Sequence, residues 1–140
     1  MAESIVKGFA EDTLIRTGET TQKKIRHIVP GDTILCPHKD GTETMETVTD
    51  VTTPQYAEVY VVVAKDTTGK VHHCYTTTTQ CLLGDDGKYV RVADIGISKK
   101  LHGDWQVVSV IHSGDRKVYD LNVSGDNTYY ADGFIAKGND

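Results

Sequence analysis

Apolar residues along this chain occur in short runs that either alternate with polar residues or consist of β-branched residues. Gly, Pro, Asp and Thr separate the runs from one another. No stretch keeps the i, i+3, i+4, i+7 apolar spacing of an amphipathic helix beyond about three turns. Short runs of this kind, bounded by turn residues, are typical of β-strands. The pattern therefore predicts an all-β chain.

The runs give the positions of the expected strands, which are residues 13–15, 24–28, 33–36, 45–53, 58–64, 71–76, 80–83, 88–91, 106–112, 117–123, 129–131 and 134–136. Turn-forming residues lie between them, for example Asp40-Gly41 and Ser113-Gly114-Asp115. Residues 76–79 are four consecutive threonines. They are interpreted as either a plain polar strand end or the hydroxyl-rich edge of a site.

The chain also resembles itself. Ile25, Ile28 and Ile34 recur at a shift of 67 as Val92, Ile95 and Leu101. Val51 precedes Val59-Tyr60-Val61 by eight residues, as Val110 precedes Val118-Tyr119-Asp120. Neither half has enough apolar surface to fold alone. We therefore expect two duplicated β-halves that pack as one pseudo-twofold domain.

Composition agrees with this fold class. β-Branched residues fill 43 of the 140 positions, with 16 Val, 9 Ile and 18 Thr, against 6 Leu and 7 Ala. β-Branched side chains lose rotamer freedom in helices and fit pleated sheets. A chain of this length forms one compact domain.

Charge and hydropathy exclude two classes of partner. The net charge is −5 and Lys and Arg do not cluster, so the chain lacks the electrostatic footprint of a nucleic-acid-binding protein. No apolar run approaches the roughly 18 residues that span a bilayer. We expect neither nucleic acid nor membrane among the partners.

Three cysteines do not form a disulfide framework, so a reducing compartment, and with it a cytoplasmic location, is favoured. Residues 1–7 are too short and too polar for a secretory signal. They are interpreted as a leader or an N-terminal flanking segment.

Four motifs carry a resemblance to a known family. They are Gly8-Phe9-Ala10-Glu11-Asp12-Thr13-Leu14-Ile15 with Gly31-Asp32-Thr33-Ile34-Leu35; Thr77-Thr78-Thr79-Gln80-Cys81-Leu82-Leu83; Val118-Tyr119-Asp120-Leu121-Asn122-Val123; and Asn127-Thr128-Tyr129-Tyr130-Ala131-Asp132-Gly133-Phe134-Ile135-Ala136. In this order and spacing the chain resembles the Hint superfamily, which comprises inteins, bacterial intein-like domains and the hedgehog autoprocessing domain. The resemblance implies a disk-like Hint domain over residues 8–139 without an endonuclease insert, and chain ends that lie close together.

The resemblance also implies a chemistry. The first residue of a Hint domain, Cys or Ser, attacks the preceding carbonyl and converts the amide into a thioester or ester. A threonine and a histidine of the middle motif bind the scissile amide and protonate its nitrogen, and an aspartate of the penultimate motif assists proton movement. These positions correspond to Gly8, Thr77, Gln80 and Asp120.

The sequence departs from the family at decisive places. Gly8 leaves the nucleophile position without a side chain, so the amide-to-ester step cannot start there. Gln80 stands where the family has histidine, and an amide does not relay a proton near neutral pH. Asn127 stands where a histidine is common. Several independent departures favour natural divergence or redesign of the whole site over one engineered substitution.

The end of the chain admits two alignments. In one, Lys137 and Gly138 fall on the final His-Asn pair of the family. In the other, which allows one inserted residue, Asn139 is the cyclising asparagine, Gly138 precedes it and Asp140 is the first downstream residue. Asn139 is the remaining candidate for cleavage chemistry, although a tail asparagine without a histidine neighbour cyclises slowly.

The resulting hypothesis is a splicing-deficient Hint domain that acts in cis on flanking polypeptide, uses no cofactor and is a monomer. Two alternatives remain open. One is a passive β-rich binding or structural domain. The other is a weak metal-binding module that uses His72, Cys74 and Cys81, because tetrahedral zinc takes Cys and His ligands.

Overall fold

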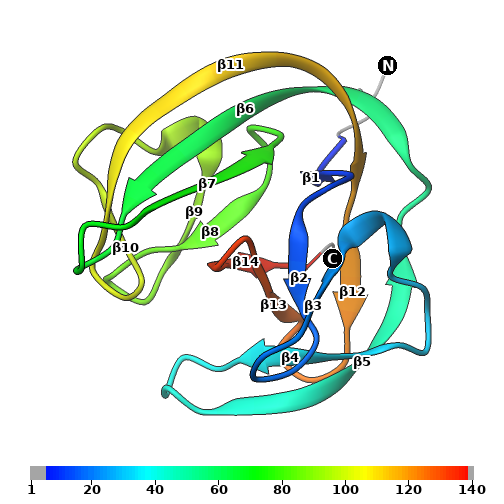
Figure 1. Ribbon diagram of the computed structural model, residues 1–140. Coiled ribbons are helices and arrows are strands. Elements are labelled where there is room, and N and C mark those ends of the chain that lie inside the picture. The colour runs from blue at the N-terminus through cyan, green and yellow to red at the C-terminus, as the bar shows by residue number, and fades with distance from the viewer. Residues whose placement is uncertain (1–5, 139–140) are drawn as a thin grey trace.

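The computed structural model describes residues 6–138, and these residues form strands joined by turns and two short 3-10 helices (Figure 1). The strands are β1 Phe9–Ala10, β2 Leu14–Arg16, β3 Gln22–Lys24, β4 Thr33–Pro37, β5 Glu43–Val51, β6 Gln55–Lys65, β7 Val71–Thr76, β8 Cys81–Leu83, β9 Tyr89–Arg91, β10 Lys100–Leu101, β11 Trp105–Tyr119, β12 Leu121–Val123, β13 Thr128–Ala131 and β14 Phe134–Lys137. The predicted all-β fold class is confirmed.

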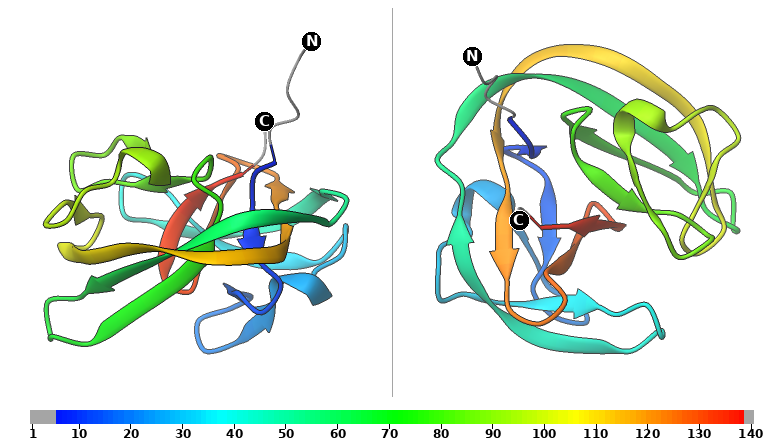
Figure 2. Two further views of the ribbon diagram at one scale, coloured as in Figure 1. Left: turned by 90° about the horizontal axis from the view of Figure 1, so that it is seen from above. Right: turned by 180° about the vertical axis from the view of Figure 1, so that it is seen from behind.

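The strands form three antiparallel sheets with the orders β1-β7-β6-β11-β10, β12-β5-β4 and β3-β2-β13-β14-β8-β9. The long strands β6 and β11 pair along most of their length and curve around one side of the molecule (Figure 1). Seen from above, the domain is flattened into a disk (Figure 2). In both views of Figure 2 the described parts of the two chain ends lie near each other.

Strand pairing confirms the duplication of the two halves. Pairs in β2–β3 recur 67 positions later in β8–β9: Leu14↔Lys24 as Cys81↔Arg91, Ile15↔Lys23 as Leu82↔Val90, and Arg16↔Gln22 as Leu83↔Tyr89. The pairing of β5 with β12 matches that of β11 with β6. Residues of β5 correspond to residues of β11 that lie 59 positions later, and residues of β12 correspond to residues of β6 that lie 59 positions earlier. Val51↔Leu121 thus matches Val110↔Val62, and Asp50↔Asn122 matches Ser109↔Val63. Each half thus contributes long strands to the sheet of the other, as a pseudo-twofold domain requires.

Two local predictions are wrong. Residues 25–28 do not continue a strand, because Ile25–His27 form a 3-10 helix that buries Ile25, and Val92–Asp94 repeat it in the second half. Ser113-Gly114-Asp115 is not a turn. β11 continues through it, and Gly114, at φ 92°, lies next to a register shift relative to β6. A bulge with a left-handed glycine lets a long strand bend without ending.

The core lies between the sheets and draws on nearly every strand. Its largest fully buried apolar side chains are Tyr129, Phe9, Ile15, Ile25, Ile34, Leu82 and Leu121. The matched pairs Ile25 and Val92, and Ile28 and Ile95, are all buried, so the sequence repeat is a repeat of core positions. Among residues 6–138, no helix is long and apolar enough to span a bilayer.

Candidate functional site

Gly8 lies at the start of β1 and is held by the end of the threonine run. Its N–H donates to Thr77 Oγ1 at 3.1 Å, and its carbonyl accepts from the Thr77 N–H at 3.0 Å. The Thr76 hydroxyl donates to the same carbonyl at 3.2 Å. Thr76 and Thr77 therefore both contact Gly8 through their hydroxyl groups.

The space beside Gly8 is closed. A Cβ atom built on Gly8 lies 2.4 Å from the carbonyl oxygen of Tyr119 and 2.7 Å from its carbonyl carbon. Both atoms belong to the backbone of β11, which pairs with β1 through Phe9↔Tyr119. Any side chain at position 8 therefore requires one of these strands to move.

The segment before Gly8 is bound as well. Thr79 Oγ1 donates to the carbonyl of Val6 at 2.6 Å and shares a 2.9 Å hydrogen bond with Thr77 Oγ1. Lys7 Nζ donates to the carbonyl of Gly138 at 3.1 Å, across 131 positions of the sequence. Lys7 and Gly138, near the two ends of the described residues, are therefore in contact.

A buried polar cluster is centred on Asp120. Tyr129 donates its hydroxyl to Asp120 Oδ1 at 2.6 Å, the Leu121 N–H donates to the same oxygen at 2.9 Å, and Gln80 Nε2 approaches it at 3.4 Å. Gln80, Asp120 and Tyr129 are each 0% exposed. Asp120 Oδ2 is buried and, among the described residues, has no hydrogen-bond partner.

Burial governs the ionisation of this cluster. Removal from water disfavours the carboxylate and raises the pKa of Asp120 to about 6, although the hydrogen bond from Tyr129 and the charge of Lys7 act in the opposite direction. Burial, and then the charge of Asp120, raise the pKa of Tyr129 well above its usual value. Asp120 thus titrates close to neutral pH, while Tyr129 stays protonated as a donor.

Gln80 occupies the position between these groups. Its Nε2 points to Asp120 and to the Tyr129 hydroxyl, both at 3.4 Å, and its Oε1 accepts from the Cys81 N–H at 3.2 Å. These contacts use both ends of the amide within the described part of the chain. Gly8 instead donates its N–H to Thr77 Oγ1 and accepts at its carbonyl from the Thr76 hydroxyl.

At the other end, Asn127 shapes the approach to Gly138. Asn127 has a left-handed backbone with φ 58°, its Oδ1 accepts from the Val123 N–H at 2.7 Å, and its carbonyl accepts from the Gly138 N–H at 2.7 Å. A Cβ at Gly138 would lie 2.1 Å from Asn127 Oδ1 and 2.6 Å from the Leu121 carbonyl oxygen. Any side chain at position 138 therefore requires Asn127 and the backbone of β12 to shift. Asn139 and Asp140 lie outside the described residues.

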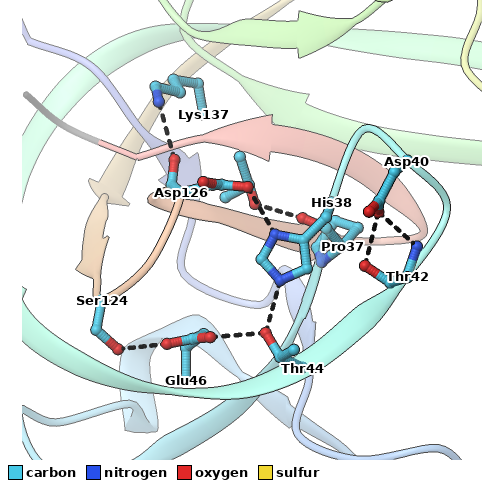
Figure 3. Close-up of polar contacts among 10 residues, drawn as sticks. Pro37, His38, Asp40, Thr42, Thr44, Glu46, Ser124, Asp126 and Lys137 are labelled. Carbon is cyan, nitrogen blue, oxygen red and sulfur yellow. Dashed lines mark hydrogen bonds and ion pairs between the residues drawn. The ribbon is translucent and has the colours of Figure 1, made fainter.

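The loop that carries Asn127 is fixed to the β4–β5 hairpin by a histidine (Figure 3). Thr44 donates its only hydroxyl proton to Glu46, so it can only accept from His38 Nε2, which lies 2.7 Å away. His38 Nδ1 lies 2.6 Å from Asp126 Oδ2. Both ring nitrogens therefore face acceptors, an arrangement that favours the protonated imidazole. The hydrogen bond to Asp126 accordingly raises the pKa of His38.

The His38 contact predicts a pH effect on stability. A folded-state pKa above the unfolded value of about 6.5 means that the contribution is fully present below that pH and is lost as the pH rises through the folded pKa. We expect His38→Gln to cost about 1 kcal/mol at pH 6 and clearly less at pH 9, measured by urea unfolding. His27→Gln, at an exposed histidine, is the matched control. An equal cost of His38→Gln at both pH values would contradict the assignment.

The proposed metal ligands His72, Cys74 and Cys81 do not form a site. His72 Nε2 bonds to Asp66 at 2.8 Å, and its ring stacks on Trp105 with 4.1 Å between centroids. Cys74 is fully buried, and burial raises the pKa of its thiol, which disfavours the thiolate that binds metal. Among residues 6–138 there is no group of three or more His, Cys, Asp or Glu that could hold a metal. The metal-binding hypothesis is therefore wrong for these residues.

Sequence reasoning missed Lys7, Thr79 and Tyr129 as parts of the site. Thr79 had a signal, since it belongs to the four-threonine run. Tyr129 looked like any core aromatic, and its hydroxyl contact depends on a strand register that one sequence does not reveal. Lys7 lies in the segment interpreted as a leader.

No family model and no curated protein matches the sequence. Among solved structures, a DnaB intein from Synechocystis is similar with a TM-score of 0.80 and 19% identity, over 96% of this chain and 100% of that chain. The gp41-1 intein gives a TM-score of 0.76 and 16% identity, over 95% and 99%. A bacterial intein-like domain from Clostridium thermocellum gives 0.75 and 20%, over 96% and 100%. The protein therefore has the Hint fold, the fold of inteins and bacterial intein-like domains.

Proposed function

We propose that this chain is an intein-like domain, over residues 8–139, that binds the polypeptide segments at both of its ends but does not rearrange the peptide bonds. In this proposal residues 1–7 belong to the upstream flanking segment and Asp140 is the first downstream residue. The observation that carries it is the closed space at Gly8, where a Cβ would meet the Tyr119 backbone at 2.4 Å.

The missing step is nucleophilic attack on the Lys7 carbonyl. That attack needs a hydroxyl or thiol on the side chain at position 8. Its oxygen or sulfur bonds to the carbonyl carbon, and the backbone nitrogen of the same residue leaves and takes up a proton. Gly8 supplies no such atom. Gln80 supplies no titratable proton for the leaving nitrogen, because a carboxamide does not ionise near neutral pH.

Contacts with the upstream segment persist without the chemistry. Thr77 holds the amide nitrogen of the Lys7–Gly8 bond, and Thr79 holds the Val6 carbonyl. Asp120 keeps a pKa of about 6, so a proton-exchanging group remains beside a site that lacks a nucleophile. The domain therefore acts as a folded monomeric module that joins two segments in cis. This role is that of the passive structural domain, the alternative that the sequence left open.

The test is intact mass spectrometry of this chain fused between two unrelated folded proteins, sampled over days with and without dithiothreitol and hydroxylamine. We expect the precursor mass to persist in every sample. Thiol- or hydroxylamine-dependent cleavage before Gly8 would overturn the proposal. Cleavage after Asn139 alone would show that cyclisation survives, and the proposed inactivity would then hold only for the upstream bond.

A further inference from the structure

Lys7 is the residue that connects the upstream flank to the last described residue of the domain. Its ammonium donates to the Gly138 carbonyl at 3.1 Å, although the two residues are 131 positions apart. Val6 and Gly8 on either side are fixed through their backbones by Thr79 and Thr77. The side chain of residue 7 is thus the one part of this segment whose identity affects the contact.

The surroundings of Lys7 favour a cation. Asp120 is 0% exposed and its Oδ2 has no hydrogen-bond partner among the described residues. An unpaired buried carboxylate oxygen is costly unless a positive charge lies nearby. The charge of Lys7 acts on Asp120 and favours its ionised form. Lys7 therefore contacts a backbone acceptor, and its charge favours the ionised form of the buried Asp120.

Other side chains satisfy only part of these requirements. Methionine has a stem of similar length but neither donor nor charge. Glutamate would place a second negative charge near Asp120. Arginine keeps the charge and a donor, although its planar guanidinium differs in shape from the ammonium.

We propose that the domain selects a basic residue immediately before Gly8, and that the ammonium of Lys7 ties the upstream segment to the C-terminal strand through the Gly138 carbonyl and the field of Asp120. The inference rests on the proposed function in treating residue 7 as part of the upstream flank. It assigns Lys7 as a positioning residue for both ends of the domain.

The experiment compares Lys7→Met, Lys7→Arg and Lys7→Glu with the unchanged chain by NMR. Lys70→Met, at an exposed lysine of the turn between β6 and β7, is the matched control. Two quantities are measured, namely hydrogen exchange of the Gly138 amide and the pKa of the Asp120 carboxyl followed through its carbon shift.

We expect Lys7→Met to speed exchange of the Gly138 N–H about tenfold, because loss of the ammonium's hydrogen bond to the Gly138 carbonyl frees this residue to open its own N–H bond to the Asn127 carbonyl. The variant should also raise the pKa of Asp120 further, because the charge of Lys7 lowers it. Lys7→Glu should do both more strongly. Lys7→Arg and Lys70→Met should leave both quantities close to those of the unchanged chain.

Unchanged exchange and an unchanged Asp120 pKa in Lys7→Met would overturn the inference, as would equal changes in Lys70→Met. Intact mass is recorded on the same samples. Cleavage before Gly8 would instead refute the proposed function, so the two failures are distinguishable.

Discussion

Replacement of Gly8 by alanine is expected to lower the free energy of unfolding by about 3 kcal/mol. The added Cβ lies 2.4 Å from the Tyr119 carbonyl oxygen and 2.7 Å from its carbonyl carbon, and neither backbone atom can rotate away. Relief of the contact requires β1 to separate from β11, which carries the Phe9↔Tyr119 and Ala10↔Val118 pairs. Overpacking of this kind costs about 1–3 kcal/mol, and a backbone obstacle places this variant at the upper end.

Urea unfolding of Gly8→Ala and Gly96→Ala measures the effect against a matched control. A Cβ at Gly96 meets no atom within 4 Å, and its φ does not lie in the left-handed range. Alanine there should change stability by less than about 1 kcal/mol, because it only reduces the freedom of the unfolded chain. A Gly8→Ala protein as stable as Gly96→Ala would show that the space at position 8 is open.

Ionisation of Asp120 is expected to cost about 2 kcal/mol of stability between pH 4 and pH 6. Burial raises the pKa of Asp120 from 3.8 to about 6. Between these two pH values the unfolded chain has lost the proton and the folded chain still holds it, so the folded state binds more protons. Stability therefore falls as the pH rises through this range and levels off above it. Each unit of pKa difference corresponds to about 1.4 kcal/mol.

Asp120→Asn separates this effect from the other groups that titrate in the same range. Asparagine keeps the shape and an acceptor oxygen for Tyr129 and Leu121, but it does not ionise. The unfolding free energy of the unchanged chain minus that of Asp120→Asn should fall by about 2 kcal/mol from pH 4 to pH 7. A difference that does not change with pH, or a carbon-shift titration of Asp120 with a midpoint near 4, would contradict the buried-carboxyl account.

Much of the fold could be predicted because the repeat in the sequence is a repeat of buried positions. Ile25 and Val92 are both buried at the start of a 3-10 helix, and a spacing of 67 residues relates them. The spacing of Ile25 and Ile28 did not predict the 3-10 helix, because two isoleucines three residues apart fit the end of a strand as well as one 3-10 turn. Chain reversal at Ser113-Gly114-Asp115 was a wrong prediction, because glycine serves a bulge and a turn equally well.

The site could be predicted only where a motif fixes a residue. Thr77 lies against Gly8 at hydrogen-bond distance, as the motif order implied. The contact of Lys7 with Gly138 and that of Tyr129 with Asp120 join distant parts of the sequence, and they depend on how the strands are paired. The obstruction at Gly8 arises in the same way, from the register of β1 against β11. The sequence shows that position 8 carries no side chain, and the register shows that a Cβ there would meet the backbone of Tyr119.

Intact mass spectrometry of two fusions, one with the unchanged chain and one with Gly8→Cys, tests the central claim most directly. Each chain is placed between two folded proteins and sampled over days with dithiothreitol and hydroxylamine, and NMR establishes the folded fraction. The account predicts that both precursors keep their full mass, since a thiol at position 8 has no space and Gln80 provides no proton. Release of a fragment that ends at Lys7 from either folded fusion would contradict it.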